Sequence, residues 1–318
     1  MKRFSIGTSI GDGFGLVTGR PLSTFVWGLL LLAPTFGSLA LILPMMGQMF
    51  ASLPAAEAAS TADEAFTDQM FAATMQLQLA SMLINVGQLV LVAIVYTAIF
   101  RAVLRPADRG FFSLRLGMDE LRVAVVGLAI GVVLYIAMIV LALIGAALIF
   151  ALWSTDPTLG GWALVIYGTL ALVGVFWALA RVSLMAPASV LHRDFAFVQG
   201  WRLASGKGWS LLGLMLVIVL LILVIEIVLV LIGVVAFSGV WATVGSTWIA
   251  DSNPIPELNA WLTANWYWVP IAGLVGSFFY GVLVALTVGP FASACRQLSD
   301  SDTSADIAVA AGSPVPAQ

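Results

Sequence analysis

The chain has 318 residues, of which 61% are hydrophobic and only 9% are charged. A soluble domain ordinarily carries about 25% charged residues, so this composition excludes a soluble fold, whose surface needs polar cover. The net charge of −3 excludes the basic footprint of a nucleic-acid-binding protein. A single cysteine excludes an intrachain disulfide, and a single histidine excludes a metal site built from several histidines.

Six apolar runs follow one another along the chain, and each exceeds the roughly 20 helical residues that cross a hydrocarbon core. They cover residues 22–49, 74–100, 122–153, 161–187, 209–237 and 266–292. Every backbone group in lipid must find a partner within its own segment, so we expect helices. We predict an all-α polytopic transmembrane bundle over residues 1–298. Residues 299–318 hold few large apolar side chains, so we predict a disordered cytoplasmic tail there.

The basic residues predict the orientation of these spans. All 13 lie at the N-terminus, in or beside the second and fourth connections, or just after the sixth span. The first, third and fifth connections hold acidic residues and no basic ones. Basic residues are retained on the cytoplasmic side. We therefore expect a multi-pass protein of the bacterial inner membrane with both termini in the cytoplasm.

Glu226 lies in the middle of the fifth span, where a carboxylate costs about 2.5–3.5 kcal/mol on insertion scales. Ser81, Asn85 and Gln88 share one face of the second span, and Asn85 and Tyr135 lie at a similar depth to Glu226. We predict that these five residues form an intramembrane polar cluster. We favour a protonated Glu226 that donates one interhelical hydrogen bond. A proton or ion relay, or exposure of Glu226 to lipid or a cavity, remains open.

Small residues spaced four apart indicate close helix contacts. Gly127 and Gly131 form such a pair on the third span, and Gly273, Ser277 and Gly281 form a triplet on the sixth. We favour packing within the chain, with a homo-oligomer as the alternative.

Four basic residues beside the predicted spans are candidate contacts for anionic lipid headgroups. They are Arg20, Arg181, Arg202 and Lys207. Membrane lipids are therefore the partners that we expect. We interpret Asp119 and Glu120 differently, as surface partners of nearby arginines in pairs that contribute little.

No motif predicts a catalytic, metal or cofactor site. His192-Arg193-Asp194 lacks the Asn and the Asp-Phe-Gly that accompany it in a kinase. Residues 200–207 lack the spacing of a P-loop, and Gly208 replaces its Ser or Thr. We therefore expect a protein that is not an enzyme and has no cofactor.

An internal repeat precedes two of the spans. Residues 13–20 and 200–207 both read Gly-aromatic-x-Leu-x-(Ser/Thr)-Gly-basic, and residues 112–122 are a looser version. The repeat predicts three hairpins, each introduced by a short amphipathic segment on the cytoplasmic surface. The alternative is convergent use of small and basic residues where helices enter the membrane.

Residues 181–187, Arg-Val-Ser-Leu-Met-Ala-Pro, are followed at 201–209 by Trp-Arg-Leu-Ala-Ser-Gly-Lys-Gly-Trp. This pair of motifs resembles the membrane domain of bacterial glycerophosphodiester phosphodiesterases and of related uncharacterised six-span proteins. In those enzymes the activity resides in a separate soluble barrel, so the resemblance implies a membrane module without that activity. We predict a non-catalytic inner-membrane protein that acts as a scaffold or in envelope or lipid homeostasis. The alternative is a small transporter or channel that uses Glu226 with the Ser81, Asn85 and Gln88 face.

Overall fold

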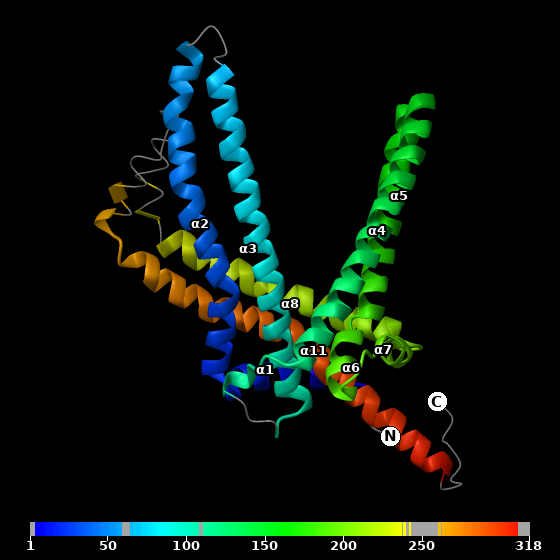
Figure 1. Cartoon of the computed structure of the whole chain (residues 1–318). Coiled ribbons are helices and arrows are strands. Elements are labelled where there is room, and N and C mark those ends of the chain that lie inside the picture. Colours follow the sequence, from blue (N-terminus) through cyan, green and yellow to red (C-terminus); the bar gives the residue numbers. More distant parts are fainter. Residues whose placement is uncertain are drawn as a thin grey trace. The chain divides into compact units, whose positions relative to one another are not determined.

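The computed structural model describes residues 4–58, 64–107, 111–236 and 263–310, together with positions 238, 239, 242, 260 and 261. Within these ranges every regular element is a helix (Figure 1). Six of the helical stretches are long and apolar enough to cross a membrane. The predicted all-α multi-pass architecture is therefore confirmed.

The helices follow one another in three groups, each of which begins with a short segment that we name its entry segment. The first group is α1 (Ile6–Gly19), α2 (Pro21–Ala58) and α3 (Glu64–Leu104). The second is η1 (Phe111–Ser113), α4 (Met118–Thr155), α5 (Pro157–Val182) and α6 (Met185–His192). The third is α7 (Phe197–Ala204), α8 (Gly208–Ala236) and α11 (Trp268–Ala310). The entry segments are α1, residues 111–117 and residues 197–207.

Several of the helices differ from the runs read in the sequence. α2 continues beyond position 49 to Ala58, and α3 begins before position 74, at Glu64. The fourth run is divided, because α5 ends at Val182 and α6 begins at Met185 after a turn. The sixth helix continues to Ala310, into the segment for which we predict a disordered tail. Residues 299–310 include alanines, which favour helix, and extending an existing helix avoids the cost of nucleating a new one. Residues 311–318 lie outside the described part of the chain.

The chain divides into two compact units. Unit 1 comprises residues 1–20, 96–220 and 285–318, and unit 2 comprises residues 21–95 and 221–284. Every basic residue that the structure describes belongs to unit 1. Lys2, Arg3 and Arg109 lie outside the described residues. We call the helix ends that carry these charges the basic end of unit 1.

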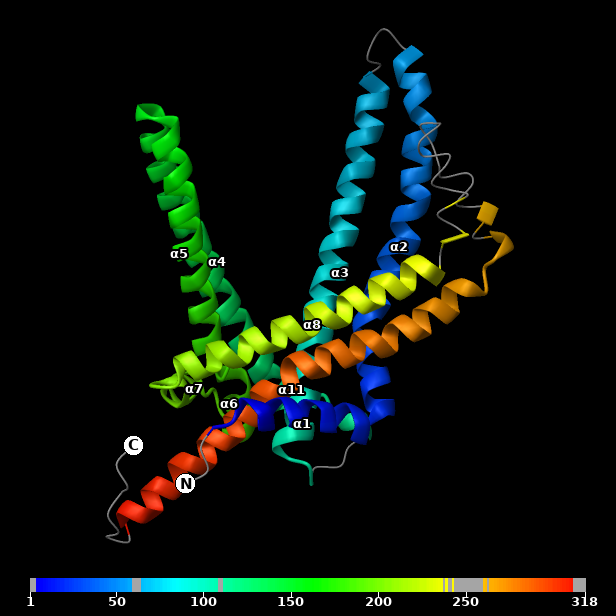
Figure 2. The ribbon, with the colours of Figure 1, turned by 180° about the vertical axis from the view of Figure 1, so that it is seen from behind.

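In unit 1, α4 and α5 form an antiparallel hairpin (Figures 1 and 2). Arg122 and Arg181 lie at one end of this hairpin, and Trp153 and Trp162 lie at the other. Apolar side chains along both helices are largely exposed on this chain, as expected of helices that meet lipid. The core of unit 1 is instead concentrated at the basic end, where α3, α6, the start of α8 and the last part of α11 bury Ile99, Leu184, Val190, Leu211 and Leu286.

The two copies of the repeat occupy similar positions in unit 1. α1 lies along α11 (Figure 2), with Gly13 against the ring of Pro290. α7 lies against α6, with Gly200 directly over the backbone of Met185. In both copies the Leu three residues later is buried. The glycine thus permits a close approach, and the buried leucine holds the entry segment on the end of another span.

In unit 2, α2 crosses α11 at its small residues. Gly28 meets the backbone of Ser277 and Gly281, and Gly273 faces the ring of Phe36. The buried Trp27 completes this core. The small-residue triplet therefore packs within the chain, which agrees with the prediction that we favoured over a homo-oligomer.

Candidate functional site

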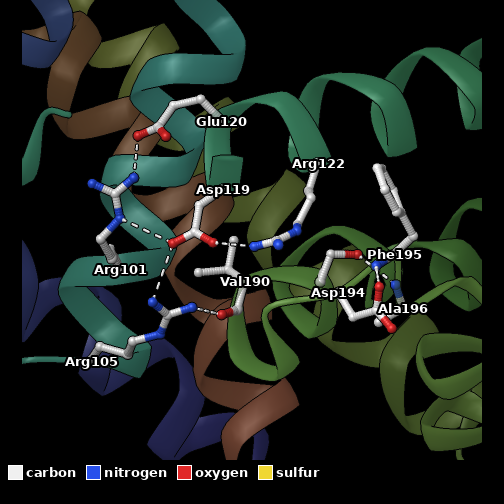
Figure 3. A network of polar contacts seen from close by, with 10 residues as sticks. Arg101, Arg105, Asp119, Glu120, Arg122, Val190, Asp194, Phe195 and Ala196 are labelled. Atoms are coloured by element: carbon white, nitrogen blue, oxygen red, sulfur yellow. Dashed lines mark hydrogen bonds and ion pairs between the residues drawn. The ribbon is translucent and has the colours of Figure 1, made fainter. Parts of the chain in front are cut away.

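The most highly organised polar site in the described residues is a network of ion pairs at the basic end of unit 1. Its members come from the last turn of α3, the first turn of α4 and the main chain of α6 (Figure 3). Three guanidinium groups face two carboxylates. They belong to Arg101, Arg105, Arg122, Asp119 and Glu120.

Arg101 and Glu120 form the most deeply buried pair of this network. Their side chains are only 5% and 8% exposed, and Nη2 of Arg101 donates to Oε1 of Glu120. Nη1 of Arg101 donates to the carbonyl oxygen of Ser113 at 3.0 Å. Two atoms of the pair, Nε of Arg101 and Oε2 of Glu120, are buried without a hydrogen-bond partner. A charge buried in this way is stable only while its partner is present.

Asp119 is shared between two further arginines. Its Oδ2 accepts from Nη1 of Arg105 at 3.2 Å, and its Oδ1 accepts from Nη1 of Arg122 at 3.0 Å. Arg105 also donates through Nη2 to the carbonyl oxygen of Val190 on α6 (Figure 3). The network therefore connects α3 with α4 and with α6.

The sequence favours this arrangement locally. Asp119 and Glu120 lie in the first turn of α4, where the positive end of the helix dipole favours carboxylates. Arg101 and Arg105 lie one turn apart at the end of α3 and so share a face. The interpretation of these acids as surface partners is wrong for Glu120, which is buried. Two adjacent acids at the start of an apolar span were the signal for a buried site.

The chemistry available to this network is limited. Oε1 of Glu120 and both oxygens of Asp119 accept from guanidinium groups. Within the described ranges there is no group of three or more His, Cys, Asp or Glu residues that could hold a metal ion. The contacts of the network join α3 with α4 and α6.

One arginine near the end of each helical group reaches the entry segment of another group. Arg101 of the first group donates to Ser113 of the second. Arg181 of the second donates through Nη2 to Oγ of Ser205 in the third, at 3.2 Å. Arg296 of the third donates through Nη2 to Oδ2 of Asp12 in the first, at 2.8 Å. The three contacts form a closed cycle, which we name the arginine cycle.

Further polar contacts reinforce the link from the third group to the first. Ser293 donates to the same Asp12 oxygen at 2.5 Å, and Nη1 of Arg296 donates to the carbonyl oxygen of Val103 at 3.0 Å. Gln297 accepts from the main-chain nitrogen of Ser5 at 3.0 Å. α11 is thus tied both to α1 and to the end of α3.

The four predicted lipid-contacting residues have different surroundings. Arg20 donates to Oγ of Ser113 at 3.1 Å. The guanidinium group of Arg181 lies over the rings of Trp177 and Trp201. Arg202 and Lys207 are exposed on the segment that carries Trp201. Sequence reasoning selected Arg181 but missed its two aromatic neighbours. Trp177 lies one turn earlier on α5, whereas Trp201 approaches only because α7 folds back onto the end of α5.

The structure places the predicted intramembrane cluster as follows. Glu226 on α8, Asn85 on α3 and Tyr135 on α4 have exposed side chains. Ser81 and Gln88 on α3 are half-buried. Gln88 donates to the carbonyl oxygen of Leu31 on α2 at 3.1 Å, while its Oε1 is buried without a partner. No hydrogen bond joins Glu226 to another residue of the described ranges, so the contact of Glu226 with Asn85 stays a prediction.

The second small-residue motif differs from the triplet on α11. Beta carbons added at Gly127 and Gly131 on α4 would meet no described atom within 4 Å. This face of α4 is therefore open on the described chain. The prediction that it mediates a homo-oligomer stays a prediction.

A scan against protein-family models found no match, and neither a search of curated proteins nor a search of solved structures found one. The class of the protein consequently rests on its own composition and fold, which define a multi-pass helical membrane protein. The resemblance to the phosphodiesterase membrane domain stays a prediction.

Proposed function

We propose that this chain is a non-catalytic protein of the bacterial inner membrane that acts as a scaffold, in envelope or lipid homeostasis. The observation that carries the proposal is the buried pair of Arg101 and Glu120, which fixes two spans to each other at the basic end of unit 1. The arginine cycle joins the ends of all three helical groups in the same unit. Helix ends that are fixed to one another in this way suit a protein that presents its spans to other membrane components.

The proposal is supported by the distribution of polar chemistry in unit 1. Three of its carboxylates, those of Asp12, Asp119 and Glu120, accept hydrogen bonds from arginines. Its long spans present mainly apolar side chains, which are suited to lipid or to other transmembrane helices. We further propose that the basic end faces the cytoplasm, because positively charged segments are retained on that side.

A transporter or channel is the second candidate, and one observation favours it. The Oε1 atom of Gln88 is buried in unit 2 without a hydrogen-bond partner, on the face of α3 that also carries Ser81 and Asn85. An unsatisfied acceptor in a span suits a passing cation or proton. In this account the ionisable group of Glu226 would be required for transport.

Complementation of a deletion strain distinguishes the two candidates. The deletion should produce an envelope defect, measured as sensitivity to detergent, that the wild-type gene restores. A scaffold predicts that Glu226→Gln restores it equally well at the same protein level, because the substitution removes only an ionisable group. Failure of Glu226→Gln at wild-type protein level would contradict the scaffold.

Reconstitution provides the second arm of this test. Purified wild-type protein in sealed vesicles is assayed for proton flux and for sodium and potassium flux. The scaffold predicts the rates of protein-free vesicles. A flux that Glu226→Gln abolishes would support the transporter and overturn the proposal.

A further inference from the structure

The guanidinium group of Arg181 is held in an aromatic setting without an acidic partner. Its central carbon lies 5.1 Å from the ring centre of Trp177 and 4.5 Å from that of Trp201. At these distances each ring attracts the cation. Within the described ranges no carboxylate lies within ion-pair distance of Arg181, in contrast to Arg101, Arg105, Arg122 and Arg296. Its positive charge is thus oriented but not neutralised.

Several hydrogen-bond donors at this place have no partner among the described residues. The only hydrogen bond of Arg181 runs from Nη2 to Ser205, and its Nε is buried and unpartnered. The indole nitrogen of Trp177 lies 3.4 Å from the position that a beta carbon on Gly208 would occupy, and no hydrogen bond from it is found. Next to Gly208, Arg181 and Trp177 thus carry hydrogen-bond donors that no described residue accepts from.

Both charged residues of the entry segment at positions 197–207 are basic. Arg202 and Lys207 are exposed on the entry segment that bears Trp201 and Ser205. No acidic residue occurs between positions 157 and 193 or between positions 195 and 225. A guanidinium group with unpartnered donors beside two exposed cations is a feature of phosphate sites.

The same entry segment also presents an apolar surface. Val198 is 76% exposed and Trp201 is exposed as well, and the exposed Phe195 and Trp209 flank the segment on either side. Trp177 and Arg181 lie in the last two turns of the span α5. Tryptophan at a span end prefers the boundary between headgroups and acyl chains, and an amphipathic helix with exposed apolar side chains lies in that boundary. A free phosphate ion would leave this apolar surface uncovered, whereas a phospholipid would cover it.

We propose that Arg181 and Trp177, with the charge of Lys207, bind the phosphate group of an anionic phospholipid, and that Trp201 and Ser205 hold the guanidinium group of Arg181 in place. The guanidinium edge and the indole nitrogen donate to the phosphate oxygens, and the acyl chains lie over Val198 and the neighbouring aromatic rings. This inference does not depend on the scaffold role, because a transporter with the same entry segment would bind the lipid equally.

Native mass spectrometry of the full chain in a neutral detergent tests the proposal. The protein is titrated with phosphatidylglycerol, with phosphatidylcholine as the zwitterionic comparison. We expect wild type to bind phosphatidylglycerol more tightly. Arg181→Gln should weaken that binding by about tenfold, because both a charge and an oriented donor are lost. Arg115→Gln is the matched control, since Arg115 is exposed and makes no ion pair in the described structure, and should change binding by less than about twofold.

Two further variants and a competitor make the outcome decisive. Arg181→Lys keeps the charge without the planar donor edge and should recover only part of the affinity. Lys207→Gln removes an exposed charge without disturbing the core, so it should weaken binding even if Arg181→Gln fails to fold. Inorganic phosphate at millimolar concentration should not displace the lipid. Equal binding of both lipids, equal loss in Arg115→Gln, or displacement by inorganic phosphate would overturn the proposal.

Discussion

Arg101 near the end of α3 and Glu120 at the start of α4 are 19 positions apart in the chain and form a buried ion pair. Around them Asp119 engages Arg105 and Arg122, and Arg105 reaches the main chain of α6. A buried pair is weak evidence for stability in itself, because desolvating two charges is costly. Its expected role is to specify which helix ends meet, because each buried charge is stable only beside its own partner.

The close approach of α7 to α6 predicts a cost for any side chain at Gly200. A beta carbon there would lie 2.6 Å from Cα of Met185, so the backbone has to shift. We expect Gly200→Ala to lower stability by about 1–3 kcal/mol, as overpacking does. Gly15→Ala on α1 is the control, because its beta carbon meets no described atom and alanine favours helix. Thermal unfolding of both variants in detergent measures the difference, and equal midpoints would contradict the packing.

The crossing of α2 and α11 in unit 2 predicts a similar contrast within one helix. Gly281 meets the main chain of Thr24, whereas a beta carbon at Gly276 would meet no described atom. Gly281→Ala should therefore destabilise the protein, again by about 1–3 kcal/mol, and Gly276→Ala should not. Chemical denaturation of each variant in detergent micelles measures the effect. Gly276→Ala being the more harmful substitution would refute this crossing.

The distribution of basic residues predicts which loops chemical labels reach. The buried Cys295 is first replaced by alanine, and single cysteines are introduced at Arg115 and at Asp156. A maleimide that cannot cross membranes should label position 156 in intact cells, and position 115 only after the cells are opened. This result follows from retention of positive charge in the cytoplasm. Labelling of position 115 from outside would invert the proposed orientation.

Much of the architecture could be predicted from composition, because lipid demands long apolar helices and the chain supplies six. The entry segments α1 and α7 were also accessible, since the repeat marks their glycine and leucine positions. The side-chain contacts between different helices could not be predicted from the sequence. The adjacent acids Asp119 and Glu120 signal a buried site, but nothing local identifies Arg101 as the partner of Glu120, because pairing depends on how the ends of two spans meet. Gln88 illustrates the same limit, since its partner is a main-chain oxygen on another helix.

The candidate lipid site was accessible only in part. Arg181 stands out in the sequence as a cation beside a span, but the sandwich between Trp177 and Trp201 requires α7 to fold back onto α5. The end of α11 was missed for a different reason. A polar segment that would be unstructured alone continues as helix when it extends a long one.

The buried pair at the basic end is tested most directly by a double-mutant cycle of Arg101→Met and Glu120→Leu, with the free energy of unfolding measured in bicelles. We expect each single substitution to lower it by about 3–5 kcal/mol, because an uncompensated charge stays buried. The double variant should lose much less than the sum, which gives a coupling of about 2 kcal/mol or more. If the loss in the double variant equals the sum of the two single losses to within about 0.5 kcal/mol, the two side chains do not interact. The proposal that this pair fixes α3 to α4 at the basic end would then be wrong.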